Sequence, residues 1–374
     1  MLQRLLLDHF RNYDRQEIRF APHVNCLVGQ NGMGKTNVLE AIYYLSLLRS
    51  FRTNRNDNLM QFGANAFTLF GEVLDAQGAT TRLGLVNSGV HDHAVSRQLQ
   101  VNGTPVKRTS EFISRLLCTA FIPEDIEVIK GAPALRRRFL NIALCTTSPD
   151  YLAALQRFTS ALHARNAMLK QPGKYPRATV TAYDHVLVES GVAIELHRSQ
   201  CADALNRALE HLSQDFFPDG RRLNVNYLSG CGFLAGPVTQ EAEALRQTYG
   251  ETLERNYDND SRNGTTRFGP QRSDLACLID QRVSVHFGSE GECRAYAIAL
   301  KLALLDLLRE RRRGDEVTML VDDVIGELDA CRRDIFLRHL ATSGQVIFAG
   351  TALPEGMPAP DKLFHVERGS VREA

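Results

Sequence analysis

The chain has 374 residues, which is long for one domain, and we expect two lobes because domains usually contain about 100–200 residues. Hydrophobic residues make up 44% and charged residues 23%, a balance that supports a packed core and excludes a disordered chain. Lys and Arg (44) nearly cancel Asp and Glu (43), so any surface for a polyanion must come from local clustering of charge.

Eight cysteines are scattered along the chain without a Cys-x-x-Cys pair or zinc-ligand spacing, which indicates reduced, intracellular thiols. The N-terminus passes straight into an apolar run and lacks the pattern of a secretory signal peptide. No apolar run approaches the roughly 20 residues that span a bilayer. We therefore expect a soluble, cytoplasmic protein with no membrane partner.

The first part of the chain predicts strands around a glycine-rich loop, followed by a helix. Strand signals, either apolar runs or period-two alternation, occur at residues 2–7, 18–20, 24–28, 67–74, 80–86 and 97–101. Apolar residues recur at helical spacing from Val38 to Leu48. Asn102-Gly103 indicates a tight turn after the last of these strands.

The middle of the chain is expected to be mostly helical, from about Leu135 to Phe216. One stripe at helical spacing contains Leu187, Ile194, Cys201, Leu205, Leu209, Leu212 and Phe216. Pro172, Gly173 and Pro176 break this region into at least two helices. A strand at 223–227, a charged helix at 238–257 and an exposed polar loop at 258–266 are expected to follow.

In the last part, strand and helix signals alternate again. Residues 317–321 and 345–349 are apolar runs typical of buried strands, and residues 294–313 predict a long helix. The sequence contains no internal repeat and no heptad pattern long enough for an extended coiled coil.

The most specific motif is the loop Gly29-Gln30-Asn31-Gly32-Met33-Gly34-Lys35-Thr36, which matches G-x-x-x-x-G-K-[ST] in full between a strand and a helix. Its glycines allow the backbone to curl, so that N–H groups and the positive end of the following helix converge on a phosphate. Lys35 would bind the β- and γ-phosphates of ATP, and the Thr36 hydroxyl would bind Mg²⁺. The length of the match and its flanks disfavour the alternative, a chance match in a glycine-rich turn.

A second predicted part of this site is the apolar strand that ends in Asp322 and Asp323. Asp322 would hold Mg²⁺ directly or through water, and Asp323 stands where a general base would polarise the attacking water. An acidic turn without a catalytic role is the alternative. Together the two motifs predict Lys35, Asp322 and Asp323 as catalytic residues, with ATP and Mg²⁺ as cofactors.

Three further segments resemble motifs of ABC-type ATPases. Ser289-Glu290-Gly291-Glu292 before the long helix resembles the signature motif, Glu327-Leu328-Asp329 resembles the D-loop, and Gly350-Thr351 stands where the family places a switch residue. The resemblance implies that Ser289, Gly291 and Asp329 contribute to nucleotide binding. Gln61 is the nearest candidate for a glutamine that contacts Mg²⁺ and water in such ATPases, and an exposed Gln before the Phe62-Gly63 turn is an equal alternative.

The long separation between the P-loop and the signature-like segment excludes compact transporter subunits and suits the SMC-like branch. Within that branch, nearly the whole chain resembles the RecF family. The resemblance is carried by Phe10-Arg11-Asn12-Tyr13 and by residues 49–53, 123–125, 130–133, 136–140 and 268–275. Three positions depart from the family's motifs, namely Gln271 for His, Ser273 for Asp and Glu292 for Gln, and we expect them close to a composite ATP site.

The resemblance implies an α/β fold, an ABC/SMC-type ATPase head with a β-rich subdomain and a short helical second lobe without a long coiled coil. The expected parts are residues 1–134 and 266–374 for the head and 135–265 for the helical arm lobe. It also implies an ATP-dependent homodimer, in which Ser289 and Gly291 of one copy cap the γ-phosphate bound to Lys35 of the other. The implied partners are single-stranded gaps and duplex junctions in DNA, together with RecO and RecR.

Arg136, Arg137 and Arg138 are candidate DNA contacts, because neutralising phosphates requires clustered cations. A solvated helix end is the alternative for this run, and also for the run at 309–313. We expect a weak DNA-dependent ATPase of recombinational repair. Two other functions remain open, an ATP-gated clamp that hydrolyses poorly and a diverged SMC-like ATPase outside gap repair.

Overall fold

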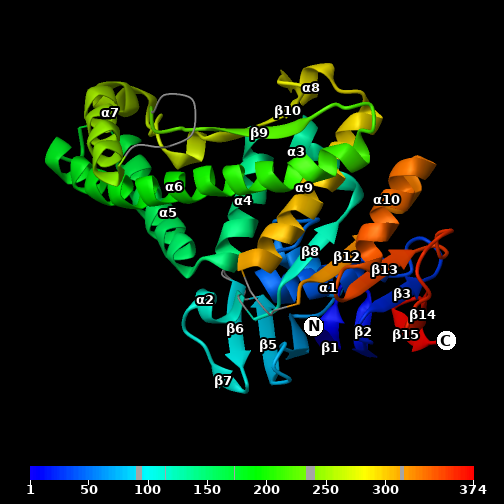
Figure 1. Cartoon of the computed structure of the whole chain (residues 1–374). Coiled ribbons are helices and arrows are strands. Elements are labelled where there is room, and N and C mark those ends of the chain that lie inside the picture. The colour runs from blue at the N-terminus through cyan, green and yellow to red at the C-terminus, as the bar shows by residue number, and fades with distance from the viewer. Residues whose placement is uncertain (90–94, 114, 172, 233–240, 312–315) are drawn as a thin grey trace. The chain divides into compact units, whose positions relative to one another are not determined.

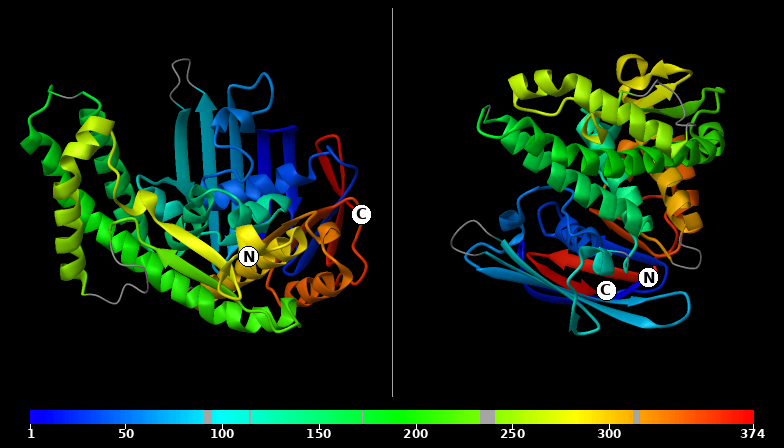
Figure 2. Two further views of the ribbon diagram at one scale, coloured as in Figure 1. Left: turned by 90° about the horizontal axis from the view of Figure 1, so that it is seen from above. Right: turned by 90° about the vertical axis from the view of Figure 1, so that its left-hand side faces the viewer.

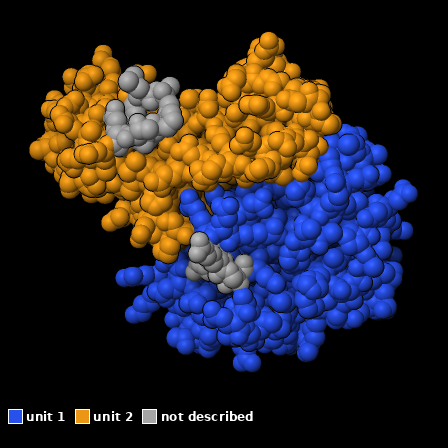
Figure 3. Space-filling view, in the orientation of Figure 1, with its two compact units in different colours: residues 1–125, 297–374 blue, residues 126–296 orange. Residues whose placement is uncertain are grey.

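The computed structural model describes residues 1–89, 95–113, 115–171, 173–232, 241–311 and 316–374 (Figure 1). The chain divides into two compact units, coloured separately in Figure 3. Unit 1 consists of Met1–Asp125 and Ala297–Ala374, and unit 2 of Ile126–Tyr296. These boundaries differ from the expected 134 and 265, and the second one falls inside helix α9 (Glu290–Arg311).

A six-stranded sheet in the order β15-β14-β3-β13-β12-β8 forms the centre of unit 1. Its strands are β3 (Val24–Val28), β8 (Cys118–Phe121), β12 (Thr318–Asp322), β13 (Val346–Gly350), β14 (Lys362–Glu367) and β15 (Ser370–Glu373). All neighbours are parallel except β14 and β15. β13 is buried throughout and β12 is buried from Thr318 to Val321, which confirms the buried strands predicted at 317–321 and 345–349. β3 is also buried throughout.

The second sheet of unit 1 is antiparallel, in the order β2-β1-β4-β5-β6-β7. It contains β1 (Leu2–Phe10), β2 (Tyr13–Arg19), β4 (Ala66–Leu74), β5 (Thr80–Gly89), β6 (Val95–Val101) and β7 (Thr104–Pro105). The alternating burial along β4 and β5 is that of a sheet with one face on the core. Asn102 (φ 53°) and Gly103 (φ 79°) form the predicted tight turn between β6 and β7.

Helix α1 (Lys35–Leu47) packs against both sheets of unit 1, on β8, β12 and β13 of one and on β1 and β4 of the other. The sequence showed one apolar stripe, but the helix is buried around most of its circumference, including Glu40, Tyr44 and Ser46. It ends at Leu47, and the next residue, Leu48, has a left-handed backbone (φ 54°). The other helices that lie entirely in unit 1 are η1 (Asn56–Leu59), α2 (Thr109–Ile113), η2 (Pro123–Asp125), η4 (Ile325–Glu327) and α10 (Ala330–Ala341).

Unit 2 is built around helix α6 (Arg177–Phe216), which contains 40 residues and runs along the whole unit (Figures 1 and 2). It packs against α5 (Pro149–Leu169), α7 (Ala242–Asn263) and β9 (Leu223–Leu228). Every member of the predicted apolar stripe from Leu187 to Phe216 is buried. The remaining elements are α3 (Ile126–Lys130), α4 (Pro133–Thr147), η3 (Pro270–Arg272), β10 (Asp274–Ile279), β11 (Arg282–Val283) and α8 (Ser284–Phe287).

The segment 258–266, expected to be an exposed loop, is largely the end of α7 and contains a buried carboxylate. Asp260 is fully buried and accepts a hydrogen bond from Arg165 (2.8 Å), whose side chain is also fully buried. Arg165 donates to Asp184 on α6 (2.7 Å) and to Thr266 (2.8 Å) as well. The expectation was wrong because polar composition alone does not show that a charge has a buried partner elsewhere in the chain.

In the described part of the chain, no helix is long and apolar enough to cross a membrane.

The Arg165 cluster gives a stability prediction for unit 2. Replacing Asp260 with Ala leaves a buried guanidinium with only part of its compensation, so the free energy of unfolding should fall by about 3 kcal/mol. Asp258→Ala, at an exposed position on the same helix, is the control and should change it by less than about 0.5 kcal/mol. Chemical denaturation of the full chain measures both variants, and equal effects would contradict the role given to the buried pair.

Candidate nucleotide-binding site

The P-loop lies at the edge of the parallel sheet where the carboxyl ends of its strands meet. It follows β3, while Asp322 ends β12 and Gly350 ends the strand between them, β13. This edge is where open α/β sheets bind ligands. The structure therefore brings together segments that the sequence analysis could only name separately.

Glycine is required at two positions of the loop because other segments of the chain pass close by. A Cβ atom on Gly29 would lie 2.3 Å from the Val366 carbonyl oxygen, which is backbone. A Cβ atom on Gly34, where φ is 118°, would lie 2.7–2.9 Å from side-chain atoms of Asn12 and Tyr13. The loop thus has the tight curl that a phosphate-binding backbone requires.

The lysine of the loop is held by the loop's own carbonyl groups. Lys35 Nζ donates to the carbonyl oxygens of Gly29 (2.6 Å) and Gln30 (2.8 Å), and the residue is only 7% exposed. Burial lowers the pKa of Lys35, while the negative charges of Asp322 and Asp323 act to raise it. The ammonium group thus lies inside the curl of the loop. A bound polyphosphate would add negative charge there, which favours the protonated form of Lys35.

The side chains of Thr36, in the first turn of α1, and Asp322, at the end of β12, bring two oxygen atoms together. The Thr36 hydroxyl donates a hydrogen bond to Asp322 Oδ1 (3.0 Å). Burial is the main cause that raises the pKa of Asp322 to about 6, and the neighbouring charge of Asp323 adds to it. A hydroxyl and a carboxylate in this position fit Mg²⁺, which takes oxygen ligands and is usually bound by one or two carboxylates plus substrate phosphates. A bound cation would also offset the cost of the buried charge.

Asp323 has a left-handed backbone (φ 51°), and its N–H donates to the Ala349 carbonyl on β13 (3.1 Å). Asp323 is exposed, whereas Asp322 is half-buried. Residues other than glycine seldom adopt this backbone region, and those that do cluster at functional sites.

The β1–β2 turn holds the P-loop in place, a role that the sequence analysis did not assign to it. Asn12 Nδ2 donates to the Met33 carbonyl oxygen (3.1 Å), and the Tyr13 hydroxyl donates to that of Gly34 (3.1 Å). Gly369, between β14 and β15, donates its N–H to Met33 as well (3.2 Å). The resemblance of residues 10–13 to a family motif was a signal, but only the structure shows its contacts.

A buried carboxylate on α1 joins the same turn to the segment after the helix. Glu40 is fully buried and receives two hydrogen bonds from Arg11, through Nε (2.8 Å) and Nη2 (2.7 Å). Ser50 donates a hydrogen bond to Glu40 and accepts the backbone N–H of Arg52 (2.9 Å). Two segments that resembled family motifs, 10–13 and 49–53, thus converge on one side chain.

The other sequence-predicted residues of unit 1 are placed as follows. Asp329 caps the N-terminus of α10, accepting the N–H of Arg332 (3.0 Å), and its side chain is half exposed. Thr351 is exposed immediately after β13. Gln61 donates its N–H to the His9 carbonyl (2.8 Å), and among the described residues no hydrogen bond joins Gln61 to the P-loop.

The signature-like segment lies in unit 2 and starts helix α9 with a reciprocal pair of hydrogen bonds. The Ser289 N–H donates to Glu292 Oε2 (2.7 Å), and the Glu292 N–H donates to Ser289 Oγ (3.3 Å). This is a capping box, in which either Glu or Gln completes the pair three residues after the Ser. The departure at position 292 therefore keeps the local geometry of the motif.

Ser273 and Gln271, expected close to a composite ATP site, make hydrogen bonds within unit 2, and that expectation stays a prediction. Ser273 is fully buried in unit 2, where its hydroxyl accepts a hydrogen bond from Arg198 (2.6 Å) and donates to the Pro270 carbonyl (2.9 Å). Gln271 donates to the Phe268 carbonyl (3.1 Å). The polar residues of this segment are used for the interior of unit 2, which a motif comparison does not reveal.

The arginine run at 136–138 is partly structural. Arg136 is buried and donates two hydrogen bonds to Asp274 (2.7 and 2.9 Å), so its guanidinium is committed to that carboxylate rather than to a phosphate. Arg137 donates to the Ser273 carbonyl (2.8 Å), and both Arg137 and Arg138 are half-buried. A DNA contact therefore remains a proposal for Arg137 and Arg138 only. In the other run, Arg312 and Arg313 lie outside the described residues.

Removing the partner of Glu40 should destabilise unit 1. Arg11→Met leaves the buried carboxylate with Ser50 and the more distant Arg52 (3.8 Å), so we expect a loss of about 3 kcal/mol in the free energy of unfolding. Arg15→Met, at an exposed position of the same hairpin, should have little effect. Denaturant titration compares the two, and an Arg11 variant as stable as the Arg15 variant would argue against the pair.

Comparison with known proteins identifies the family of the chain. The profile of the RecF/RecN/SMC N-terminal domain family matches residues 1–367. The DNA replication and repair protein RecF of Lacticaseibacillus casei is 31% identical over 381 residues, which cover all of both chains. The protein of the same name from Streptococcus thermophilus is 32% identical over 375 residues, which cover all of this chain and 98% of the relative.

Solved structures agree with the sequence comparison. The structure of the recombination mediator protein RecF with ATP superposes with a TM-score of 0.90 at 28% identity, covering all of this chain and 97% of that one. An Smc head bound to the C-terminal winged-helix domain of ScpA gives a TM-score of 0.54 at 16% identity, covering all of this chain and 96% of that one, and shows the shared fold. The expected ABC/SMC-type head is thereby confirmed, and the chain belongs to the RecF family of SMC-like ATPases.

Proposed function

We propose that this chain binds Mg-ATP at the P-loop of unit 1 and uses it to dimerise on DNA in recombinational repair. The observation that carries the proposal is the pairing of the Thr36 hydroxyl with Asp322 (3.0 Å) at the sheet edge that also holds Lys35. In P-loop NTPases a Ser or Thr of the loop and a carboxylate after a buried strand hold the magnesium ion.

Each residue of the site has a proposed role. Lys35 and the curled backbone from Gly29 onward bind the β- and γ-phosphates, while Thr36 and Asp322 hold Mg²⁺. The ion, when bound, would neutralise charge on the phosphate oxygens. Asp323 accepts a proton from the attacking water, and we expect slow turnover because its side chain is shorter than the Glu of faster ABC enzymes. Asp329, Thr351 and Gln61 remain proposed contacts near the nucleotide.

A second copy of the chain would complete the site. Ser289 and Gly291 of one copy cap the γ-phosphate bound to Lys35 of the other, so ATP joins the two. Near the signature motif, Phe287 is 69% exposed and Val285 is 38% exposed, which suits a surface that a second copy covers. Hydrolysis removes the γ-phosphate contacts and loosens the dimer.

The DNA role is inferred from the relatives. Those from Lacticaseibacillus and Streptococcus are named for DNA replication and repair, and the solved RecF structure is placed in the RecFOR pathway. We infer that this chain binds single-stranded gaps and duplex junctions and works with RecO and RecR. Arg137 and Arg138 are the proposed phosphate contacts, and DNA affinity in the ATP state should fall as salt rises.

The second candidate is a weakly hydrolysing, ATP-gated clamp outside gap repair. Departures from the family motifs at 273 and 292 would favour such a clamp, but Ser273 is a buried core residue and Glu292 completes a capping box. What still favours it is the short side chain of Asp323. ATP turnover measured with and without DNA separates the two functions, because a repair ATPase should respond to the DNA.

Nucleotide binding should depend on Lys35. Lys35→Ala removes the ammonium group that the loop holds, and we expect ATP affinity to fall by about a hundredfold, since a charge-assisted contact to phosphate contributes about 1.5–3 kcal/mol. Lys107→Ala, at an exposed position of unit 1, should bind like the wild type. Isothermal titration calorimetry measures both, and undiminished ATP binding by the Lys35 variant would sink the proposal.

Dimerisation should depend on the signature serine while nucleotide binding does not. Ser289→Arg places a long side chain where the second copy must approach, so ATP should no longer convert monomer to dimer. Affinity for ATP should stay, because the P-loop belongs to unit 1 and Ser289 to unit 2. Ser160→Arg, on the exposed side of α5, is the matched control. Sedimentation velocity with and without ATP measures dimerisation. A Ser289 variant that still dimerises would contradict the proposed capping of the γ-phosphate by Ser289.

A further inference from the structure

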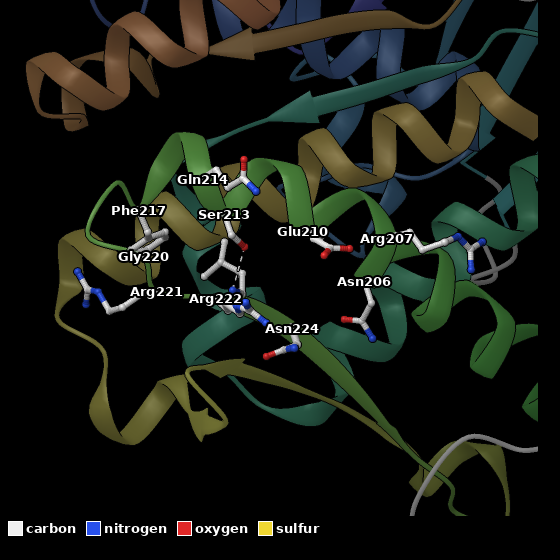
Figure 4. Close-up of a pocket in the computed structure, with 11 residues that line it drawn as sticks. Asn206, Arg207, Glu210, Ser213, Gln214, Phe217, Gly220, Arg221, Arg222 and Asn224 are labelled. Atoms are coloured by element: carbon white, nitrogen blue, oxygen red, sulfur yellow. Dashed lines mark hydrogen bonds between the residues drawn. The ribbon is translucent and has the colours of Figure 1, made fainter.

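The turn between α6 and β9 presents an arginine to the signature motif. Arg221 pairs with Asp219 through Nε (2.8 Å) and Nη2 (2.7 Å), and its guanidinium lies over the ring of Phe217, 5.0 Å from the centroid. Its Nη1 donates to Glu292 of the signature motif. Figure 4 shows Arg221 next to Phe217 and Gly220 at one end of a pocket of about 480 Å³ lined by the end of α6 and the start of β9.

Both acids of the signature motif have a cationic partner. Glu290 pairs with Arg294 one turn along α9 (2.9 Å), and Glu292 pairs with Arg221 from the separate turn. The Arg221 guanidinium, followed by the Ser289 N–H, holds the pKa of Glu292 below its ordinary value, so Glu292 is ionised at neutral pH.

The charge at position 292 is not needed for the local structure. A Gln completes the same capping box without a charge, so the carboxylate adds a full negative charge beside Ser289. Ser289 is the residue that must approach the γ-phosphate of a second copy, on the function proposed above. An uncompensated carboxylate there would repel the phosphate, and like charges brought together across an interface are costly.

We propose that Arg221 is a positioning residue for the signature motif, which cancels the charge of Glu292 so that Ser289 can approach a nucleoside triphosphate held by a second copy of this chain. This inference rests on the proposed function, because it needs the ATP-dependent dimer. It assigns a role in nucleotide capping to a turn that lies far from Ser289 in the sequence.

A purely structural role for Arg221 makes a different prediction. If Arg221 served only to hold its turn through Asp219 and Phe217, then its loss would be equally harmful whatever residue stood at 292. If it serves to cancel charge, then Glu292→Gln makes it dispensable. A double-mutant cycle between positions 221 and 292 distinguishes the two.

The experiment compares Arg221→Met, Glu292→Gln and the double variant in the full chain, with Mg-ATP at low salt. Sedimentation equilibrium gives the dimer dissociation constant, which we expect to rise by about tenfold or more in Arg221→Met, since at each of the two symmetric sites Glu292 loses its cationic partner beside Ser289. Glu292→Gln and the double variant should both stay within about twofold of the wild type. Arg222→Met, the exposed neighbour in the same pocket, is the matched control and should dimerise normally.

Normal dimerisation by Arg221→Met would overturn the inference, and so would a double variant as defective as Arg221→Met. Should Arg221→Met not fold, Arg221→Lys tests the same point, because it keeps a positive charge but loses the planar fork. The Arg221→Lys variant should dimerise more weakly than the wild type and more strongly than an Arg221→Gln variant. Equal dimerisation by the Lys and Gln variants would contradict a charge role. Wild-type protein that stays monomeric with ATP would instead refute the proposed function, and this inference with it.

Discussion

The hydrogen bond between Thr36 and Asp322 joins residues that are 286 positions apart in the chain. It forms because β3, β13 and β12 are neighbouring parallel strands, so their carboxyl ends meet at one edge of the sheet. The P-loop leaves from the first of these strands and the paired acids from the last. Without that strand order, the lysine, hydroxyl and carboxylate would be separate motifs and not one site.

Buried charges align the segments around this edge. Glu40 is taken out of water in the middle of α1, which is tolerable only because Arg11 and Ser50 supply hydrogen bonds. Since Arg11 belongs to the turn whose next residues, Asn12 and Tyr13, hold the P-loop, the position of the loop is tied to the burial of one carboxylate. The same logic holds in unit 2, where Arg165 joins three helices.

This physical reading changes the meaning of the motifs that link the chain to the RecF family. Arg136 and Asp274 come from two of those motifs, and in the structure they form a bidentate pair between α4 and β10. Ser273 is likewise part of the interior. Glu292 instead belongs to the signature-like segment, where it caps α9 together with Ser289 and accepts a hydrogen bond from Arg221. A residue of a family motif can therefore serve a contact within the fold.

By itself, the sequence determined the P-loop, the acidic strand end, most strands and the apolar stripe of α6. These features are local, because periodicity and glycine placement act over a few residues. Only the tertiary structure decided that Asp258–Asn263 completes a helix, that α1 is buried between two sheets and that Arg136 is committed to Asp274. Each of these depends on a partner far along the chain, and a charged residue looks the same in sequence whether it faces water or a buried counter-charge.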